Sequence, residues 1–401
     1  MLGLWKNELR FFFSRRNLLV FLAVLLAVPF VFYASLCKSA ENWEAETSES
    51  ILKQSEYAQI YINNYENKIA YYEVKEPESE KLSDMKEVLQ LWKTYNAENN
   101  LLAVYWQNPD KWEDEIRTLT RQTDELLSDA PDLSEEEEYA LYRQTKRDWN
   151  QRMLLHNAYE ESGTDEPVNP AEPTGAYALY QVLSGYHLIF LLLIVLIVCW
   201  NYDCWSMEFD AGTYRLFYIQ PYSRRCLLWV RSLTHWLFSM LGCLLVLGEV
   251  YLCGAIRYGS GWSDYVIENN EILKTFGTIL PQDNLMQSDV VLSMAQAVLL
   301  RFGLACLFLT FCYLVVQFFS FLCKSGMLSV ICTFALAIFV FSTNIAGQGA
   351  AQSLLPLYYY RIDSLLTGDM QIGVPFYLLI ETISAAVIWV GTRIWMEHRN
   401  L

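Results

Sequence analysis

Six long apolar runs constrain this chain more than any other feature of its sequence. The hydrocarbon core of a bilayer is about 30 Å thick, so a helix that crosses it needs roughly 20 mostly apolar residues at about 1.5 Å each. One such run could be a buried helix of a soluble core, but six together favour membrane spans. The predicted spans are Leu18–Leu36, Leu183–Tyr202, Leu227–Ile256, Val291–Leu322, Met327–Ala346 and Pro375–Trp395.

Charge is distributed unevenly along the 401 residues, whose formal net charge is −16. Residues 37–177 hold 31 Asp and Glu against 14 Lys and Arg, which gives −17, and the rest of the chain holds 14 acidic and 15 basic residues, which gives +1. An acidic, water-soluble domain therefore interrupts a nearly neutral apolar chain. The length, with 53% hydrophobic and 15% aromatic residues, excludes intrinsic disorder and a small disulfide-stapled module.

The acidic domain has the composition of helices. Glycine is absent from 38 to 162, and Glu, Lys, Gln, Leu and Ala are abundant. The predicted fold class is all-α: a polytopic membrane protein with six transmembrane helices and an extracellular helical-bundle domain between the first and the second. Proline positions and capping signals predict helices in this domain at 41–75, 80–107, 109–129 and 134–161.

The predicted orientation follows from the basic residues that flank the spans. An even number of spans places both termini on one side. That side carries eleven basic residues: Lys6, Arg10, Arg15, Arg16, Arg215, Arg224, Arg225, Arg231, Lys324, Arg393 and Arg399. The opposite short loops carry Arg257, Lys274 and Arg361, with Arg301 at the start of the fourth span. Both termini are therefore expected to be cytoplasmic.

The compartment is predicted from residues that the acidic domain lacks. Residues 38–177 contain no cysteine, so this domain needs no disulfide. They also contain no Asn-x-Ser/Thr acceptor, which favours a bacterial cell membrane. A disulfide between Cys37 and Cys253 stays open. The predicted organisation is an amphipathic cytoplasmic interfacial helix at 1–17, a first span at 18–36, the extracellular domain at 37–177, and the remaining spans at 178–401 with a cytoplasmic loop at 203–226.

The loop between the second and third spans carries the most informative pattern. It reads E-x-x-x-G-T and then P-x-S-R, at Glu208, Gly212, Thr213, Pro221, Ser223 and Arg224. This segment resembles the ABC-2 type permease family. The resemblance implies that the loop is a coupling helix that fits a groove on a separate ATPase subunit, where ATP and Mg bind. An ordinary basic loop between two spans is the alternative.

The N-terminus is predicted to form an amphipathic helix ahead of the first span. Trp5 shares one helical face with Leu2, Leu9 and Phe12, while Lys6 and Arg10 occupy another face. In ABC-2 permeases a connecting helix takes this place. The large outer insertion between spans one and two is similar to the sodium-export-type branch of that family.

The sequence contains no motif for catalysis. It has no Gly-Lys pair and hence no phosphate-binding loop, no H-E-x-x-H pair and no G-x-S-x-G elbow. We expect that the chain is not an enzyme by itself, and that it holds neither a cofactor nor a metal. The expected partners are an ABC ATPase subunit, a second permease copy or a paralogue, and the lipid bilayer, with no nucleic acid.

Among the charged residues inside the predicted spans, three lie away from the basic flanks, and a charge at such a position is costly. They are Glu249, Arg301 and Glu381, all placed in the outer half of the bilayer. One interpretation is a hydrated vestibule or a substrate contact. The other is an interhelical salt-bridge cluster, in which one arginine faces two glutamates.

Three classes of function fit these features unequally. The first is the permease subunit of an ATP-driven exporter, and the acidity of the outer domain favours a cationic or amphipathic peptide, a toxin or an ion as its cargo. The alternative is a membrane receptor or sensor whose outer domain binds an extracellular ligand. An intramembrane enzyme is disfavoured, because no paired catalytic residues lie at matching depth. The aromatic residues of the outer domain form either the bundle's core or a ligand-binding face.

Overall fold

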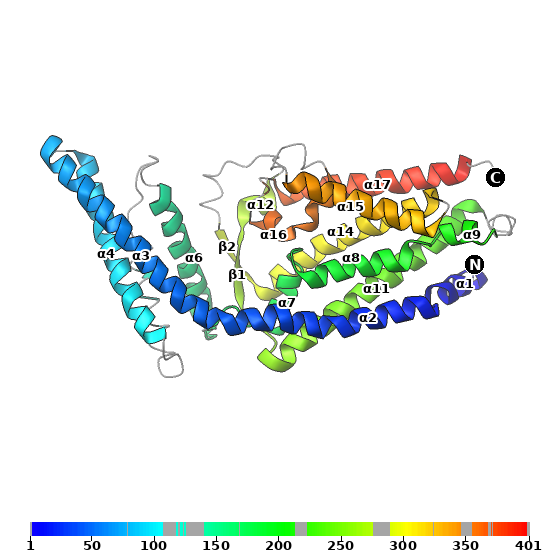
Figure 1. The fold of residues 1–401 in the computed structure, drawn as a ribbon, viewed down its shortest axis with the longest axis horizontal. Helices are drawn as coiled ribbons and strands as arrows, with labels where there is room; N and C mark the ends of the chain where they lie inside the picture. Colours follow the sequence, from blue (N-terminus) through cyan, green and yellow to red (C-terminus); the bar gives the residue numbers. More distant parts are fainter. Residues whose placement is uncertain are drawn as a thin grey trace. The chain divides into compact units, whose positions relative to one another are not determined.

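The computed structural model describes residues 2–77, 79–106, 118, 121–122, 124–125, 140–167, 169–212, 223–275, 289–323, 325–345, 355–367, 370 and 372–398. The described chain is mostly helical (Figure 1), as the sequence predicts. It forms two compact units. The membrane unit comprises Met1–Leu36, Pro173–Trp262 and Glu268–Leu401, and the acidic unit comprises Cys37–Glu172 and Ser263–Ile267.

Five helical stretches are long and apolar enough to cross a membrane, which agrees with a multi-pass membrane protein. They are Arg15–Trp43, Leu188–Glu208, Arg224–Tyr258, Met294–Leu322 and Val374–Trp395, and they match the predicted spans one to four and six. Helix α15 (Gly326–Ile345) covers the predicted fifth span. Its apolar part among the described residues runs from Gly326 to Leu336, so the sixth crossing stays a prediction.

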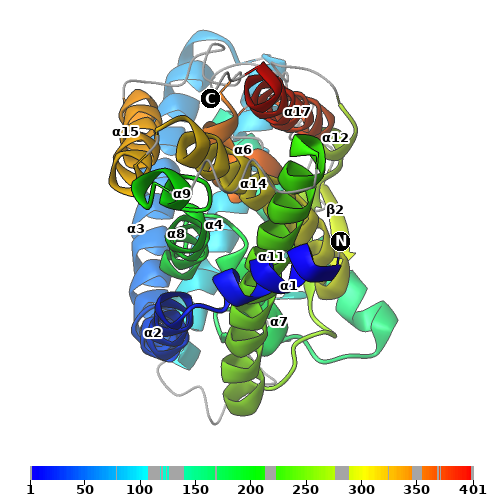
Figure 2. The ribbon, with the colours of Figure 1, turned by 90° about the vertical axis from the view of Figure 1, so that its right-hand side faces the viewer.

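Four long helices of the membrane unit, α8, α11, α15 and α17, lie around α14 (Figure 2). The unit contains the helices α1 (Leu2–Phe12), α2 (Arg15–Phe32), α8 (Leu188–Asn201), α11 (Arg224–Tyr258), α14 (Met294–Leu322), α15 and α17 (Val374–His398). A π-helical turn, η1 (Tyr33–Cys37), follows α2, and its last residue, Cys37, belongs to the acidic unit. Helix α14 packs against α8, α15 and α17. It is the central helix of the unit because it is apolar on every side and buried on most of them.

Short elements connect the long helices. They are α7 (Gly175–Val182), α9 (Ser206–Asp210), α12 (Asn270–Lys274), the 3-10 helix η4 (Pro356–Tyr360), α16 (Ile362–Leu366), and the strands β1 (Tyr265–Asn269) and β2 (Asp289–Ser293), which pair in a two-stranded sheet. The sequence analysis did not predict these strands. Two expected span starts also shift, because the second helix begins at Leu188 instead of Leu183 and the fourth begins at Met294 instead of Val291.

Local chemistry explains both shifts. Gly185 adopts φ +89°, a left-handed conformation that ends α7 and separates it from α8. Ser293 caps α14: its side chain accepts from the backbone of Gln296, and the Gln296 side chain accepts from the backbone of Ser293. The polar connections therefore extend further into the apolar runs than hydropathy alone predicts.

The described helices of the acidic unit are α3 (Lys38–Lys75), α4 (Glu80–Trp106) and α6 (Ala140–Ser162). Helices α3 and α4 pair through an apolar cluster of Ala58, Ile62, Tyr65, Ile69, Leu82, Met85, Val88, Trp92 and Tyr95. Trp92 is buried and stacks on Tyr61, whereas Tyr57 is 63% exposed. Part of the aromatic set thus forms the core. The predicted helix 109–129 lies outside the described residues, apart from 118, 121–122 and 124–125.

Candidate functional site

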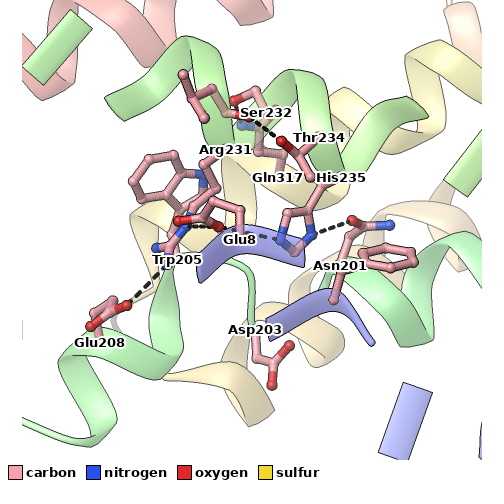
Figure 3. A network of polar contacts seen from close by, with 12 residues as sticks. Glu8, Asn201, Asp203, Trp205, Glu208, Arg231, Ser232, Thr234, His235 and Gln317 are labelled. Atoms are coloured by element: carbon pink, nitrogen blue, oxygen red, sulfur yellow. Dashed lines mark hydrogen bonds and ion pairs between the residues drawn. The ribbon is translucent and has the colours of Figure 1, made fainter. Parts of the chain in front are cut away.

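A buried ion-pair network joins α1, α9 and α11 in the membrane unit (Figure 3). Arg231 of α11 donates from Nε to Glu8 Oε2 of α1 at 3.0 Å, and from Nη2 to Glu208 Oε1 of α9 at 3.0 Å. Glu8 and Arg231 are each 3% exposed. One guanidinium therefore connects the N-terminal helix to the helix that begins the loop between α8 and α11.

The helical repeat places Glu8 in this network. Glu8 lies three residues after Trp5 and four before Phe12, so the three side chains share one face of α1. That face packs inward: Phe12 is buried, and Trp5 packs against an apolar cluster of Cys204, Trp205, Leu227, Leu228, Val230 and Phe321. The guanidinium of Arg231 lies 5.0 Å from the centre of the Trp205 ring. The charges are thus surrounded by apolar side chains, where charge-assisted hydrogen bonds are strong.

A second set of hydrogen bonds extends the network along α11. His235 Nδ1 lies 3.1 Å from Asn201 Oδ1, and Asn201 Nδ2 donates to Ser239 Oγ at 2.9 Å and to the carbonyl of Ile197 at 2.7 Å. Since the amide nitrogen is used twice as a donor, the Asn201 oxygen accepts, and His235 Nδ1 carries the proton. The two side chains therefore hold α8 against α11 in one register.

The start of α2 is attached to the end of α8 by another ion pair. Arg16 Nη2 donates to Asp203 Oδ1 at 2.9 Å, and Arg16 Nη1 donates to Tyr202 Oη at 3.0 Å. Trp200 Nε1 donates to the carbonyl of Asn17 at 3.0 Å. The start of α2 is therefore connected by polar contacts to the segment that leads into the loop at 203–226.

The predicted coupling residues occupy different positions. Glu208 lies in the network, and Gly212 is exposed with φ +67°, a left-handed conformation that favours glycine. Arg224 is the first residue of α11, and Ser223 caps that helix by accepting from the backbone of Cys226. Thr213 and Pro221 lie outside the described residues.

The N-terminal residues follow the predicted division of faces. Trp5 is half-buried, whereas Lys6 and Arg10 are exposed. Sequence reasoning missed Glu8 and treated Arg231 as a flanking cation. The signal was present, since Glu8 is an acidic residue on the apolar face of an amphipathic helix and Arg231 lies five residues inside a predicted span.

The intramembrane charges do not meet as the salt-bridge interpretation expected. Arg301 Nη2 binds Glu268 Oε1 at 3.1 Å, Asp363 Oδ1 at 2.8 Å and Tyr180 Oη at 2.7 Å. These partners come from α7, β1 and α16, so the arginine does face two carboxylates, but they belong to connecting segments. Burial raises the pKa of Glu268 above its ordinary value, although the charge of Arg301 opposes that shift.

The two glutamates of the expected cluster lie elsewhere. Glu249 on α11 is half-buried. Glu381 on α17 is 0% exposed, and within the described part of the structure neither of its carboxyl oxygens has a hydrogen-bond partner. A pairing of Arg301 with Glu249 and Glu381 is therefore replaced by the pairing with Glu268 and Asp363.

The described residues contain no group of three or more His, Cys, Asp or Glu side chains that could hold a metal ion. Cys37 and Cys253 do not form a disulfide. Comparisons with protein-family models, with curated proteins and with solved structures found no match. The residues of the ion-pair network and of the loop beside it are therefore the basis for assigning a function.

Proposed function

We propose that this chain is the membrane subunit of an ATP-driven exporter of the ABC-2 permease type, with ATP and Mg bound by a separate ATPase subunit. The observation that carries the proposal is the position of Glu208. This residue begins the loop pattern that resembles the family's coupling segment, and Arg231 holds it together with Glu8 of the N-terminal helix. The coupling segment and the amphipathic helix thus share one buried cation.

This geometry supports mechanical coupling between a docked ATPase and the membrane helices. Helix α11 has 35 residues, which at 1.5 Å per residue corresponds to about 52 Å, more than the thickness of the hydrocarbon core. Arg231 is its eighth residue and lies about two turns from its start. A displacement of the loop at 203–226 is therefore passed to a rigid helix that spans the membrane, and packed interfaces respond to such a displacement by switching between discrete arrangements.

The proposal includes the orientation and the cargo. Both termini and the loop at 203–226 lie in the cytoplasm of a bacterial cell, and the acidic unit lies outside. A second permease copy or a paralogue completes the membrane part. The charge of −17 over residues 37–177 attracts cations, which supports a cationic or amphipathic peptide as cargo.

Co-purification tests the proposal directly. The full chain, tagged and isolated from its native membranes, is expected to retain a protein with a phosphate-binding loop, identified by mass spectrometry. Retention of a histidine kinase in its place would favour a sensor and contradict the proposal. ATPase activity in the chain free of any other subunit would contradict it as well.

A variant pair then tests the coupling site. Glu208→Gln removes one charge from the network, and a hydrogen bond to a charged group contributes about 1.5–3 kcal/mol, so stimulated ATP turnover is expected to fall at least about tenfold. Glu73→Gln is the matched control, because Glu73 pairs with Lys86 on the surface of the acidic unit. Equal turnover in both variants would remove Glu208 from the coupling path.

A further inference from the structure

An apolar groove of about 500 Å³ lies in the membrane unit among α8, α14, α15 and η4. Its walls are aliphatic and aromatic, and include Leu191, Ile194, Val198, Phe308, Val316 and Phe334. Tyr186, His187 and Tyr360 line one end, so that end is polar. The volume falls in the range of about 300–1,000 Å³ that is usual for sites that bind small molecules.

The groove is open on its side. Leu191 is 46% exposed, Phe334 is 48% exposed and Ile338 is 66% exposed, although all three line it. These residues lie on α8 and α15, at depths where the spans meet hydrocarbon chains instead of water. An occupant therefore enters from the bilayer.

The depth of the groove matches one leaflet. Its lining on α8 runs from Leu188, where the apolar span begins, to Val198. Ten residues of helix correspond to about 15 Å, which is half of the hydrocarbon thickness of about 30 Å. An acyl chain of one leaflet extends from the membrane surface to the middle of the bilayer, which is the same depth.

The polar end of the groove carries a positive charge. Arg361 directly follows Tyr360, its Nε donates to Tyr186 Oη, and its guanidinium lies 4.8 Å from the centre of the Tyr186 ring. Tyr186 is two residues before the span, at the level of lipid headgroups. In the described part of the structure no carboxylate forms an ion pair with Arg361, and the nearby Asp363 binds Arg301. The guanidinium is thus available for an anion.

We propose that this groove binds one acyl chain of an anionic phospholipid from the surrounding bilayer. The apolar wall takes the chain, and the terminal nitrogens of Arg361, whose Nε is held by Tyr186, take the phosphate. A bidentate guanidinium contact suits a phosphate group. The site goes beyond the proposed export function, because it does not depend on which cargo is carried or on the ATPase.

The retention of lipids by the purified chain tests this proposal. The full chain is purified in detergent, mixed with phosphatidylglycerol or phosphatidylcholine of the same acyl chains, and analysed by native mass spectrometry. Phosphatidylglycerol is expected to be retained about tenfold better. Arg361→Gln is expected to abolish this preference, and Arg361→Lys to keep most of it, because the lysine retains the charge.

A second variant pair tests the wall of the groove. Ile194→Trp fills it from α8 and is expected to lower retention of both lipids, while Leu299→Trp, at a position 70% exposed outside the lining, is expected to change neither. A phosphatidylglycerol with a photoreactive acyl chain is expected to label groove residues of α8 and α14 in the unmodified chain.

Two results would overturn the proposal. They are equal retention of the two lipids by the unmodified chain, and labelling spread evenly over the lipid-facing sides of α11 and α17. The labelling experiment uses the unmodified chain, so it decides the outcome even where Ile194→Trp fails to fold. Neither of these results bears on whether an ATPase co-purifies, so the two proposals fail independently.

Discussion

Arg231 is the residue on which the ion-pair network depends, because it neutralises two carboxylates that come from separate elements. A buried ion pair contributes little net stability relative to apolar residues of the same shape, since each charge loses its hydration. Removal of one partner is different, because the remaining charges stay buried and uncompensated. The main effect of the network is therefore to specify that α1, α9 and α11 pack together, and its net contribution to stability is small.

Arg231→Met is expected to destabilise the protein by about 3–5 kcal/mol, because it leaves the buried Glu8 without its cation. The measurement is the free energy of unfolding of the detergent-purified chain in denaturant. A second change, Glu8→Gln, is expected to recover part of the loss. As a control, Lys86→Gln breaks an exposed pair with Glu73 and should cost at most about 1 kcal/mol. Equal losses of unfolding free energy for Arg231→Met and Lys86→Gln would contradict this explanation.

Gly185 offers a second test at the scale of one residue. A Cβ at this position would lie 1.7 Å from the carbonyl oxygen of Tyr360, and φ is +89°. Gly185→Ala is therefore expected to cost at least about 2 kcal/mol, from steric overlap and backbone strain together. Gly163→Ala is the control: φ is +66° but nothing lies within 4 Å, so only strain of about 1–2 kcal/mol is expected. Thermal unfolding of both variants measures the difference, and a larger loss at Gly163 would refute it.

At the scale of elements, the predicted helices that could be compared agree closely with the observed ones. The predicted helix 80–107 is α4 (Glu80–Trp106), and 41–75 is α3 (Lys38–Lys75), since proline at position 77 and helix-forming residues define these limits. The strands β1 and β2 were missed because five residues next to an apolar span carry too short a pattern to separate from it.

The candidate site was only partly predictable. Glu208 was found through a local pattern, whereas Glu8, Asn201 and His235 contribute through contacts between residues far apart in the sequence. The periodicity of apolar residues predicts which face of a helix is buried, but it does not predict which charged side chains form pairs between helices. For the same reason the interpretation that paired Arg301 with Glu249 and Glu381 looked only at charges inside spans, whereas its carboxylate partners lie in the connecting segments.

Helix α6 is expected to respond to pH through His156. Burial would lower the pKa of this imidazole, but its hydrogen bonds with Asp124 and Glu166 and their negative charges outweigh burial and raise the pKa to about 9. Arg152, on the same helix, lies 3.5 Å from Asp124. Because the folded chain binds the proton more tightly than the unfolded chain, this stabilisation is complete below about pH 6.5 and is lost as the pH rises through about 9.

Hydrogen exchange in the full chain measures this effect. Amide protection in α6, corrected for the intrinsic pH dependence of exchange, is expected to decrease between pH 6.5 and 9 and beyond. The variant His156→Gln is expected to show a lower protection that no longer changes over this range. If the unmodified chain keeps constant protection, or if the variant keeps the same slope, His156 is not the titrating group.

At the scale of the whole molecule, α15 decides on which side the C-terminus lies. With the five stretches found in the described structure the number of crossings is odd, and with α15 it is even. The basic residues near both ends favour the even number, because Lys6, Arg10 and Arg393 then lie on the same side. A protease-sensitive tag at each terminus is expected to be protected in intact cells and cleaved in lysed cells. Cleavage of the C-terminal tag alone in intact cells would show that α15 does not cross.

The sides of the acidic unit and of the loop can be tested without knowing the number of crossings. Between Asn100 and Ala211 the described helices include one stretch that is long and apolar enough to cross, Leu188–Glu208, so these two exposed residues are expected on opposite sides. The charge bias assigns Asn100 to the outside. An impermeant maleimide should therefore label Asn100→Cys in intact cells, and label Ala211→Cys only after the membrane is permeabilised. The unmodified chain is the control, because none of its ten cysteines is exposed. Labelling of both variants in intact cells would mean that Leu188–Glu208 does not cross, and the loop at 203–226 could then not meet a cytoplasmic ATPase.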